Sequence, residues 1–183
     1  MHFYVKSSGK GESINKITDI KGLKVGVFTK SSSVGPIAVN WLVLNDIPVD
    51  SSHIVEFKNQ DELPDALIEN RVDVIGLSKA EADRGKEKYG DRIKKIGESD
   101  PFPGYAIAIS PTMDKDHAER LTQTLWKLHT TPEGAAALKN FDIGSSANTT
   151  QLKQTSKREY EKAFSQIERA RALYPKSPAD GKK

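Results

Sequence analysis

The residues best suited to hold a ligand form a serine-rich segment, Thr-Lys-Ser-Ser-Ser-Val-Gly-Pro, at residues 29–36. The segment follows an apolar run at residues 23–28 and precedes a helical pattern that opens near Pro36. The first N–H groups of a helix have no partner within the helix, and serine hydroxyls add further donors. We therefore predict that five of these residues hold a small anion: Thr29, Ser31, Ser32, Ser33 and Gly35. A soluble loop with a helix cap also explains a lone serine-rich turn.

Two further polar loops follow strand-like runs later in the chain. Gln60 and Asp61 come after the run at residues 53–57, and Ser78 comes after the run at residues 72–77. In open α/β sheets, ligands bind beyond the carboxyl ends of the strands. The three loops should therefore converge, which favours a binding site over a simple capped loop and adds Gln60, Asp61 and Ser78 to the predicted ligand-binding residues.

The elements that position these loops alternate between strand and helix. Apolar, β-branched runs predict strands at residues 3–6, 23–28, 53–57, 72–77 and 92–97, with helices after the second, third and fourth of them. Parallel strands need crossover connections, and alternating helices supply them. The predicted fold class is α/β, with a mainly parallel sheet flanked by helices on both faces.

The second half of the chain is predicted to be mostly helical. We expect one more strand at residues 105–110 and a loop at 141–150, with helices at about 114–129, 131–139 and 155–173. The expected division is an α/β lobe with hinge strands at residues 1–110, a helical C-terminal region at 111–175 and a disordered tail at 176–183. In the last helix the pattern puts four apolar side chains on one stripe: Tyr160, Phe164, Ile167 and Tyr174.

Catalytic patterns are absent from the sequence. It has no nucleophile elbow, phosphate-binding glycine loop or metalloprotease pattern, and no cysteine. Its four histidines have no metal-ligand spacing. A small enzyme on the same fold would use Asp61 or Asp73 as acid or base. We therefore expect a binding protein that needs no cofactor, metal or catalytic residue.

Charge and hydropathy limit the classes of partner expected for this chain. The formal net charge is +3, and residues 153–183 carry nine basic against four acidic side chains, so the remainder is slightly acidic. A basic helix of this kind is more often a solvated face than a nucleic-acid site, and no nucleic-acid motif accompanies it. No apolar run is long enough for a signal peptide or a membrane span.

Several segments resemble one family of transport receptors. The run from Ile17 to Val27 resembles the entry into the second lobe of type II periplasmic solute-binding proteins, and the serine segment with Gly35 and Pro36 resembles the phosphonate and phosphite receptors of ABC importers. The run from Arg71 to Val74 and the one from Thr131 to Gly134 match two further motifs of that family. The resemblance covers roughly residues 13–145.

The resemblance implies a two-lobed clamp that holds a phosphonate, phosphite or phosphate ester for import, with Ser31, Ser32 and Ser33 on its oxygens. Where the family has a histidine and an aspartate, this chain has Gln60 and Asp61, and an acidic position of the family is Ser78 here. The amine-recognising half of an aminophosphonate site is therefore altered.

The resemblance also implies the partners and the compartment. A first lobe of about a hundred residues would normally precede the strand at residues 3–6, so we expect a second lobe with C-terminal helices. The expected partners are a small anionic ligand and an ABC permease or another chain that supplies the missing lobe, in the periplasm or another extracytoplasmic space. The alternative is a ligand-sensing or protein-interaction domain of a signalling receptor, whose basic last helix contacts a partner.

Overall fold

The computed structural model describes residues 1–104, 106–140 and 150–174, and it divides into two compact units. The first unit combines Met1–Pro101 with the chain from Lys162 onward, and the second comprises Phe102–Glu161. The predicted tail at 176–183 and nearly all of the predicted loop at 141–150 lie outside the described residues.

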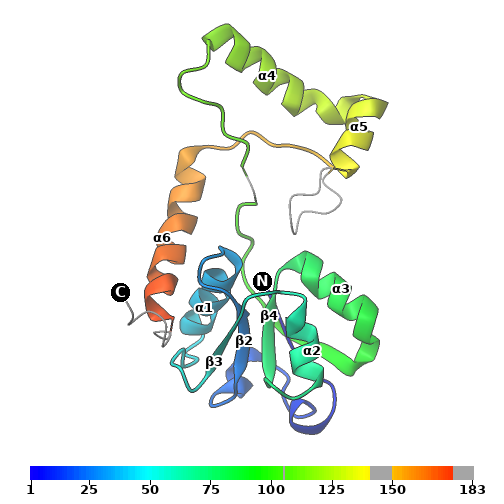
Figure 1. Ribbon diagram of the computed structural model, residues 1–183, viewed down its shortest axis with the longest axis vertical. Helices are drawn as coiled ribbons and strands as arrows, with labels where there is room; N and C mark the ends of the chain where they lie inside the picture. The colour runs from blue at the N-terminus through cyan, green and yellow to red at the C-terminus, as the bar shows by residue number, and fades with distance from the viewer. Residues whose placement is uncertain (105, 141–149, 175–183) are drawn as a thin grey trace. The chain divides into compact units, whose positions relative to one another are not determined.

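A five-stranded sheet forms the centre of the first unit (Figure 1). Its strands are β1 (His2–Lys6), β2 (Val25–Phe28), β3 (Ile54–Phe57), β4 (Val74–Leu77) and β5 (Ile93–Glu98), in the order β3-β2-β4-β1-β5. β2 pairs in parallel with β3 and β4, whereas β1 lies antiparallel to both β4 and β5. Four strands thus run in one direction and β1 runs against them, which confirms the predicted α/β fold with a mainly parallel sheet.

Helices cover both faces of this sheet, as predicted. On one face α1 (Val34–Leu44) and the C-terminal part of α6 (Lys157–Leu173) pack on Phe3, Val27 and Val74. On the other, α2 (Glu62–Ile68) and α3 (Lys79–Tyr89) pack on Ile75 and Leu77. Successive side chains of a strand point to opposite faces, so the neighbours Val74 and Ile75 serve the two separate cores. Short 3₁₀ turns, at Gly9–Gly11, Ile17–Ile20 and Gly90–Arg92, complete this unit.

The second unit contains α4 (Lys115–Lys127), a 3₁₀ turn (Leu128–Thr130) and α5 (Pro132–Lys139). Both helices begin as the sequence predicts. Asp114 accepts a hydrogen bond from the N–H of His117, and Thr131 accepts one from the N–H of Gly134 with Pro132 in the first turn. Few side chains of this unit are buried, and Trp126 on α4 is 41% exposed.

The predicted strand at residues 105–110 is wrong, because residues 106–110 have no strand structure. Tyr105 lies outside the described residues. A strand needs a neighbour for its N–H and C=O groups, and no described strand pairs with this run. Ile107 is 47% exposed, so β propensity alone did not determine the local structure.

The predicted apolar stripe of α6 is also partly wrong. Ile167 and Tyr174 are buried, but their buried neighbours on the helix are Ala163 and Ala170, while Phe164 is 60% exposed. The buried spacing of 4, 3 and 4 residues is a regular helix face that is offset from Phe164. Small alanines on this face allow the helix to approach the lobe closely.

Candidate anion-binding site

The serine loop, defined here as Thr29–Ser33, connects the carboxyl end of β2 to the first turn of α1. β2 is buried between β3 and β4, so the loop leaves the middle of the parallel part of the sheet. Ser31 and Ser33 are exposed, and Thr29 and Ser32 are half-buried. The loop is therefore accessible to a ligand at the start of an 11-residue helix.

Some hydrogen-bond donors of this loop already bond within the protein, and others do not. The Thr29 and Ser31 hydroxyls lie 3.2 Å apart and share a hydrogen bond, and the Ser32 hydroxyl accepts one of 3.0 Å from the N–H of Val34. The N–H and hydroxyl of Ser33 make no hydrogen bond within the described part of the chain. Ser33 thus offers two free donors beside the helix dipole, an arrangement that suits an oxyanion.

Charged groups of both signs border the serine loop. The N–H of Lys30 donates a 2.7 Å hydrogen bond to the carboxylate of Glu56 at the end of β3. On the α6 side, the guanidinium of Arg171 donates to the Lys30 carbonyl at 3.1 Å. The loop therefore has a negative neighbour from β3 and a positive neighbour from α6.

Gly35 lies beneath this loop rather than in it. A Cβ at this position would stand 2.0 Å from the carbonyl oxygen of Phe28 and 2.3 Å from the hydroxyl of Tyr174. The Tyr174 hydroxyl donates a 2.9 Å hydrogen bond to that same carbonyl. Burial raises the pKa of the Tyr174 phenol, and the carboxylate of Glu56 raises it further, so the phenol stays a donor. Gly35 is needed because only a residue without a side chain permits this contact.

The loops after β3 and β4 form a second group, here called the acceptor cluster: Gln60, Asp61, Ser78 and Glu81. The Ser78 hydroxyl caps α3 by accepting a hydrogen bond of 3.4 Å from the N–H of Glu81. Glu81 is only 7% exposed and pairs with Arg84. The side-chain carbonyl oxygen of Gln60 is buried and has no hydrogen-bond partner among the described residues.

The carboxyl groups of Asp61 and Glu81 interact directly. Burial raises the pKa of the Glu81 carboxyl; the Arg84 guanidinium opposes that effect, and a hydrogen bond with the Asp61 carboxyl adds to it. The Lys30–Glu56 hydrogen bond joins the loop after β2 to strand β3. Because β2 is parallel to both β3 and β4, the loops that follow these three strands leave the same edge of the sheet.

The sequence analysis did not assign four residues to the neighbourhood of these loops: Glu56, Glu81, Arg171 and Tyr174. The Ser-x-x-Glu spacing of Ser78 and Glu81 is a capping-box pattern, so Glu81 had a readable signal. Arg171 and Tyr174 had none, because their contacts with the serine loop join positions about 140 residues apart. The ligand roles of the eight predicted residues remain predictions.

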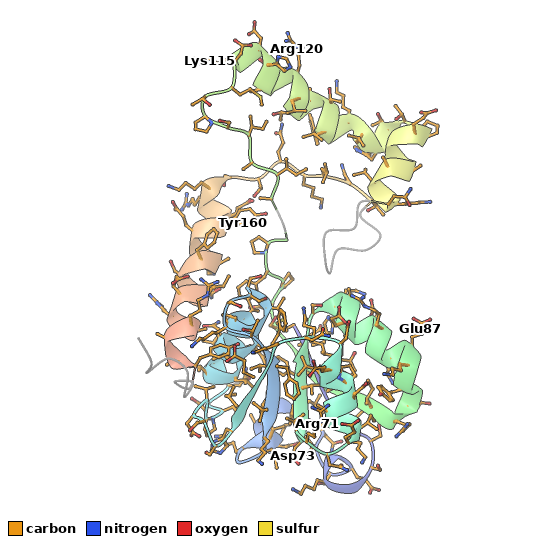
Figure 2. All side chains as sticks on the ribbon, viewed as in Figure 1. Arg71, Asp73, Glu87, Lys115, Arg120 and Tyr160 are labelled. Atoms are coloured by element: carbon orange, nitrogen blue, oxygen red, sulfur yellow. The ribbon has the colours of Figure 1, made fainter. Side chains whose placement is uncertain are left out.

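Two other features do not belong to these loops. Asp73, the other carboxylate considered for catalysis, precedes β4 and accepts a hydrogen bond from the N–H of Lys24, at the opposite end of the strands (Figure 2). In the second unit, a hollow on α4 is lined by Glu119, Arg120, Gln123, Thr124 and Lys127. One helix supplies that whole lining, so it lacks the converging elements of a binding site.

The described residues contain neither a metal-ion cluster nor a membrane-spanning helix. Their His, Asp and Glu side chains form no group of three that could hold a metal ion. None of their helices is long and apolar enough to cross a membrane.

Comparisons with solved structures show the same fold. The chain is similar to XAC2383 from Xanthomonas citri bound to ATP (20% identity, TM-score 0.73, 94% of this chain and 67% of that one) and to the same protein bound to chloride (18%, 0.69, 93% and 66%). It is also similar to a binding protein component of an ABC phosphonate transporter from Pseudomonas aeruginosa (13%, 0.63, 92% and 57%). The chain thus spans about two thirds of the first protein and less of the second.

Sequence comparison identifies the family. No curated protein matches the chain. The family model described as "ABC transporter, phosphonate, periplasmic substrate-binding protein" matches residues 7–159, which include β2 to β5, the serine loop, α4 and α5. This family consists of transport receptors that bind small ligands and work with a permease. From this match and the shared fold, we conclude that the chain belongs to the family of phosphonate periplasmic substrate-binding proteins of ABC transporters.

Proposed function

We propose that this chain is a solute-binding lobe that holds a small oxyanion, a phosphonate, phosphite or phosphate ester, at the serine loop for ABC-type import. The observation that carries the proposal is Ser33, whose N–H and hydroxyl are unused within the described residues at the start of α1. The exposed hydroxyl of Ser31 adds a third donor. Oxyanions are bound by such groups because the donors and the helix dipole both favour negative charge.

The comparisons support the same class of ligand. The family is named for phosphonate, and a protein of the same fold was solved with chloride and with ATP, both of them anions. An ABC permease is the proposed partner, and the periplasm or an equivalent extracytoplasmic space is the proposed location. A second lobe, from elsewhere in the protein or from another chain, would close over the ligand.

The acceptor cluster bears on the choice among these ligands. Asp61, Glu81 and the buried Gln60 carbonyl offer acceptors, so they favour a positively charged group over a second anion. Ser78 can still donate its hydroxyl proton while it accepts the hydrogen bond from Glu81. A ligand with an oxyanion and an amine would match both sides of the site.

Calorimetric titration with phosphate, phosphite, methylphosphonate and 2-aminoethylphosphonate tests the proposal, with ethylamine, which has no oxyanion, as a cationic control. In the matched variant, both Ser31 and Ser33 are changed to alanine. We expect saturable binding of at least one oxyanion, weakened about a hundredfold in the variant because two charge-assisted hydrogen bonds are lost. Tight binding of ethylamine with no response to any oxyanion would contradict the proposal.

A further inference from the structure

Arg171 in the last turn of α6 and Tyr174, which follows that helix, bind backbone carbonyls between Phe28 and Ser32. Arg171 donates to the carbonyl of Lys30 at 3.1 Å and to that of Ser32 at 3.5 Å, and Tyr174 donates to the carbonyl of Phe28 at 2.9 Å. The three carbonyls belong to alternate residues of one segment. All three are therefore turned toward the same helix.

This contact is built into the lobe and is not a chance surface approach. Tyr174 is 6% exposed, and Ala170, one turn before it, is fully buried. Arg171 is oriented from its own helix by Glu168, whose carboxylate lies 2.6 Å from the guanidinium. On the other side, Gly35 leaves the space that the Tyr174 hydroxyl needs. Both partners are thus shaped for the contact.

The direction of these carbonyls matters for an anion. A carbonyl oxygen carries partial negative charge and repels an oxyanion, whereas N–H and O–H groups attract it. Donors from α6 hold the oxygens of residues 28, 30 and 32 away from the open side of the loop, where Ser31 and Ser33 are exposed. Arg171 also brings a positive charge to the loop.

We propose that Arg171 and Tyr174 are positioning residues of the anion site, which hold the serine loop with its donors, not its carbonyls, toward the ligand. This inference rests on the proposed function. It assigns the C-terminal helix to the binding site of the lobe. Because coupling between two sites is reciprocal, a ligand that orders the loop must also stabilise the last turn of α6.

Hydrogen exchange of the ligand-free protein tests the positioning directly. We expect amide exchange in residues 29–34 to rise about tenfold in Arg171→Gln and Tyr174→Phe, because the first change releases carbonyls of the loop and the second releases the Phe28 carbonyl, where the loop begins. Exchange in β4 should be unchanged. Arg169→Gln is the matched control, since Arg169 is exposed on the same helix and makes no hydrogen bond or ion pair within the described residues. Loop exchange equal to wild type in both variants would overturn the inference.

Anion titration of the same proteins separates positioning from mere helix attachment. We expect affinity for methylphosphonate to fall about tenfold in Arg171→Gln and Tyr174→Phe, to recover in part in Arg171→Lys and to stay unchanged in Arg169→Gln. Wild-type protein with methylphosphonate should show slower exchange at residues 168–174. If Arg171→Gln does not fold, Tyr174→Phe decides, since it removes a single oxygen atom.

The two failures are distinguishable. If wild-type protein binds no oxyanion, the proposed function fails, and this inference fails with it. If wild-type protein binds methylphosphonate and both variants bind it equally well, the inference alone is wrong, and α6 is simply attached to the lobe.

Discussion

The serine loop and the acceptor cluster lie at the same edge of one sheet but offer opposite chemistry. Within the described residues, the serine loop presents unused N–H and O–H donors at Ser33, and Arg171 of α6 binds its Lys30 and Ser32 carbonyls. The acceptor cluster presents carboxyl groups and the Gln60 carbonyl oxygen, which has no partner in the described part of the chain, and its serine already caps a helix. The difference shows that strand topology brings loops together, while the local hydrogen bonds decide which sign of charge each loop can bind.

The largest expected effect comes from Gly35→Ala, which breaks the support of the serine loop. The added Cβ would overlap the Phe28 carbonyl and the Tyr174 hydroxyl. We expect a loss of about 3 kcal/mol in the free energy of unfolding, seen as a fall of roughly 6–12 °C in melting temperature. Gly104→Ala is the control, because nothing lies within 4 Å of its added Cβ. Equal melting temperatures for the two variants would contradict this account of Gly35.

The next largest effect is expected to differ between Ser33 in the serine loop and Ser78 in the acceptor cluster. Ser33→Ala removes a free donor, so oxyanion affinity should fall about tenfold without loss of stability. Ser78→Ala removes the cap of α3 and should cost about 1 kcal/mol of stability, with a smaller loss of affinity. Titration and thermal melting of both variants measure the contrast, and a Ser33→Ala protein that binds as well as wild type would remove Ser33 from the site.

A smaller effect is expected for Glu81→Gln. The raised pKa means that the folded protein disfavours ionised Glu81, so its contribution to stability is fully present below the unfolded pKa and is lost as pH rises through the folded pKa. A glutamine keeps a donor toward Asp61 without the charge. Thermal melting from pH 4 to 8 should show the variant gaining about 2–4 °C over wild type as pH rises. If the difference in melting temperature between variant and wild type does not grow with pH, ionised Glu81 is not destabilising.

The smallest effect is expected for Glu56→Gln, which removes the negative charge beside the serine loop. The amide oxygen can still accept the hydrogen bond from Lys30, so only the repulsion changes. We expect oxyanion affinity to rise about two- to fivefold at low salt. Glu87→Gln changes the net charge equally, and Glu87 lies exposed on α3 (Figure 2), so affinity should not change in this control. A loss of affinity in Glu56→Gln would mean that Glu56 supports the ligand.

Most of the fold could be predicted from the sequence because its signals are local. The five strands of the sheet, the capped start at Thr131 and the last helix follow from apolar runs and cap residues. The prediction of a strand at residues 105–110 was wrong because a strand depends on a pairing partner. The buried face of α6 was predicted incorrectly because buried alanines give only a weak hydrophobic signal. In the site, convergence of the loops followed from topology, whereas the roles of Glu56, Arg171 and Tyr174 depend on contacts between distant segments.

The most direct test of the central claim, that an oxyanion occupies the serine loop, is a nitrogen-15 NMR titration of the chain with methylphosphonate. The account predicts that the largest amide shifts occur at Ser31, Ser32 and Ser33, with weaker changes at Asp61 and Glu81. Largest shifts on α4 around Arg120, or shifts confined to the acceptor cluster, would contradict it.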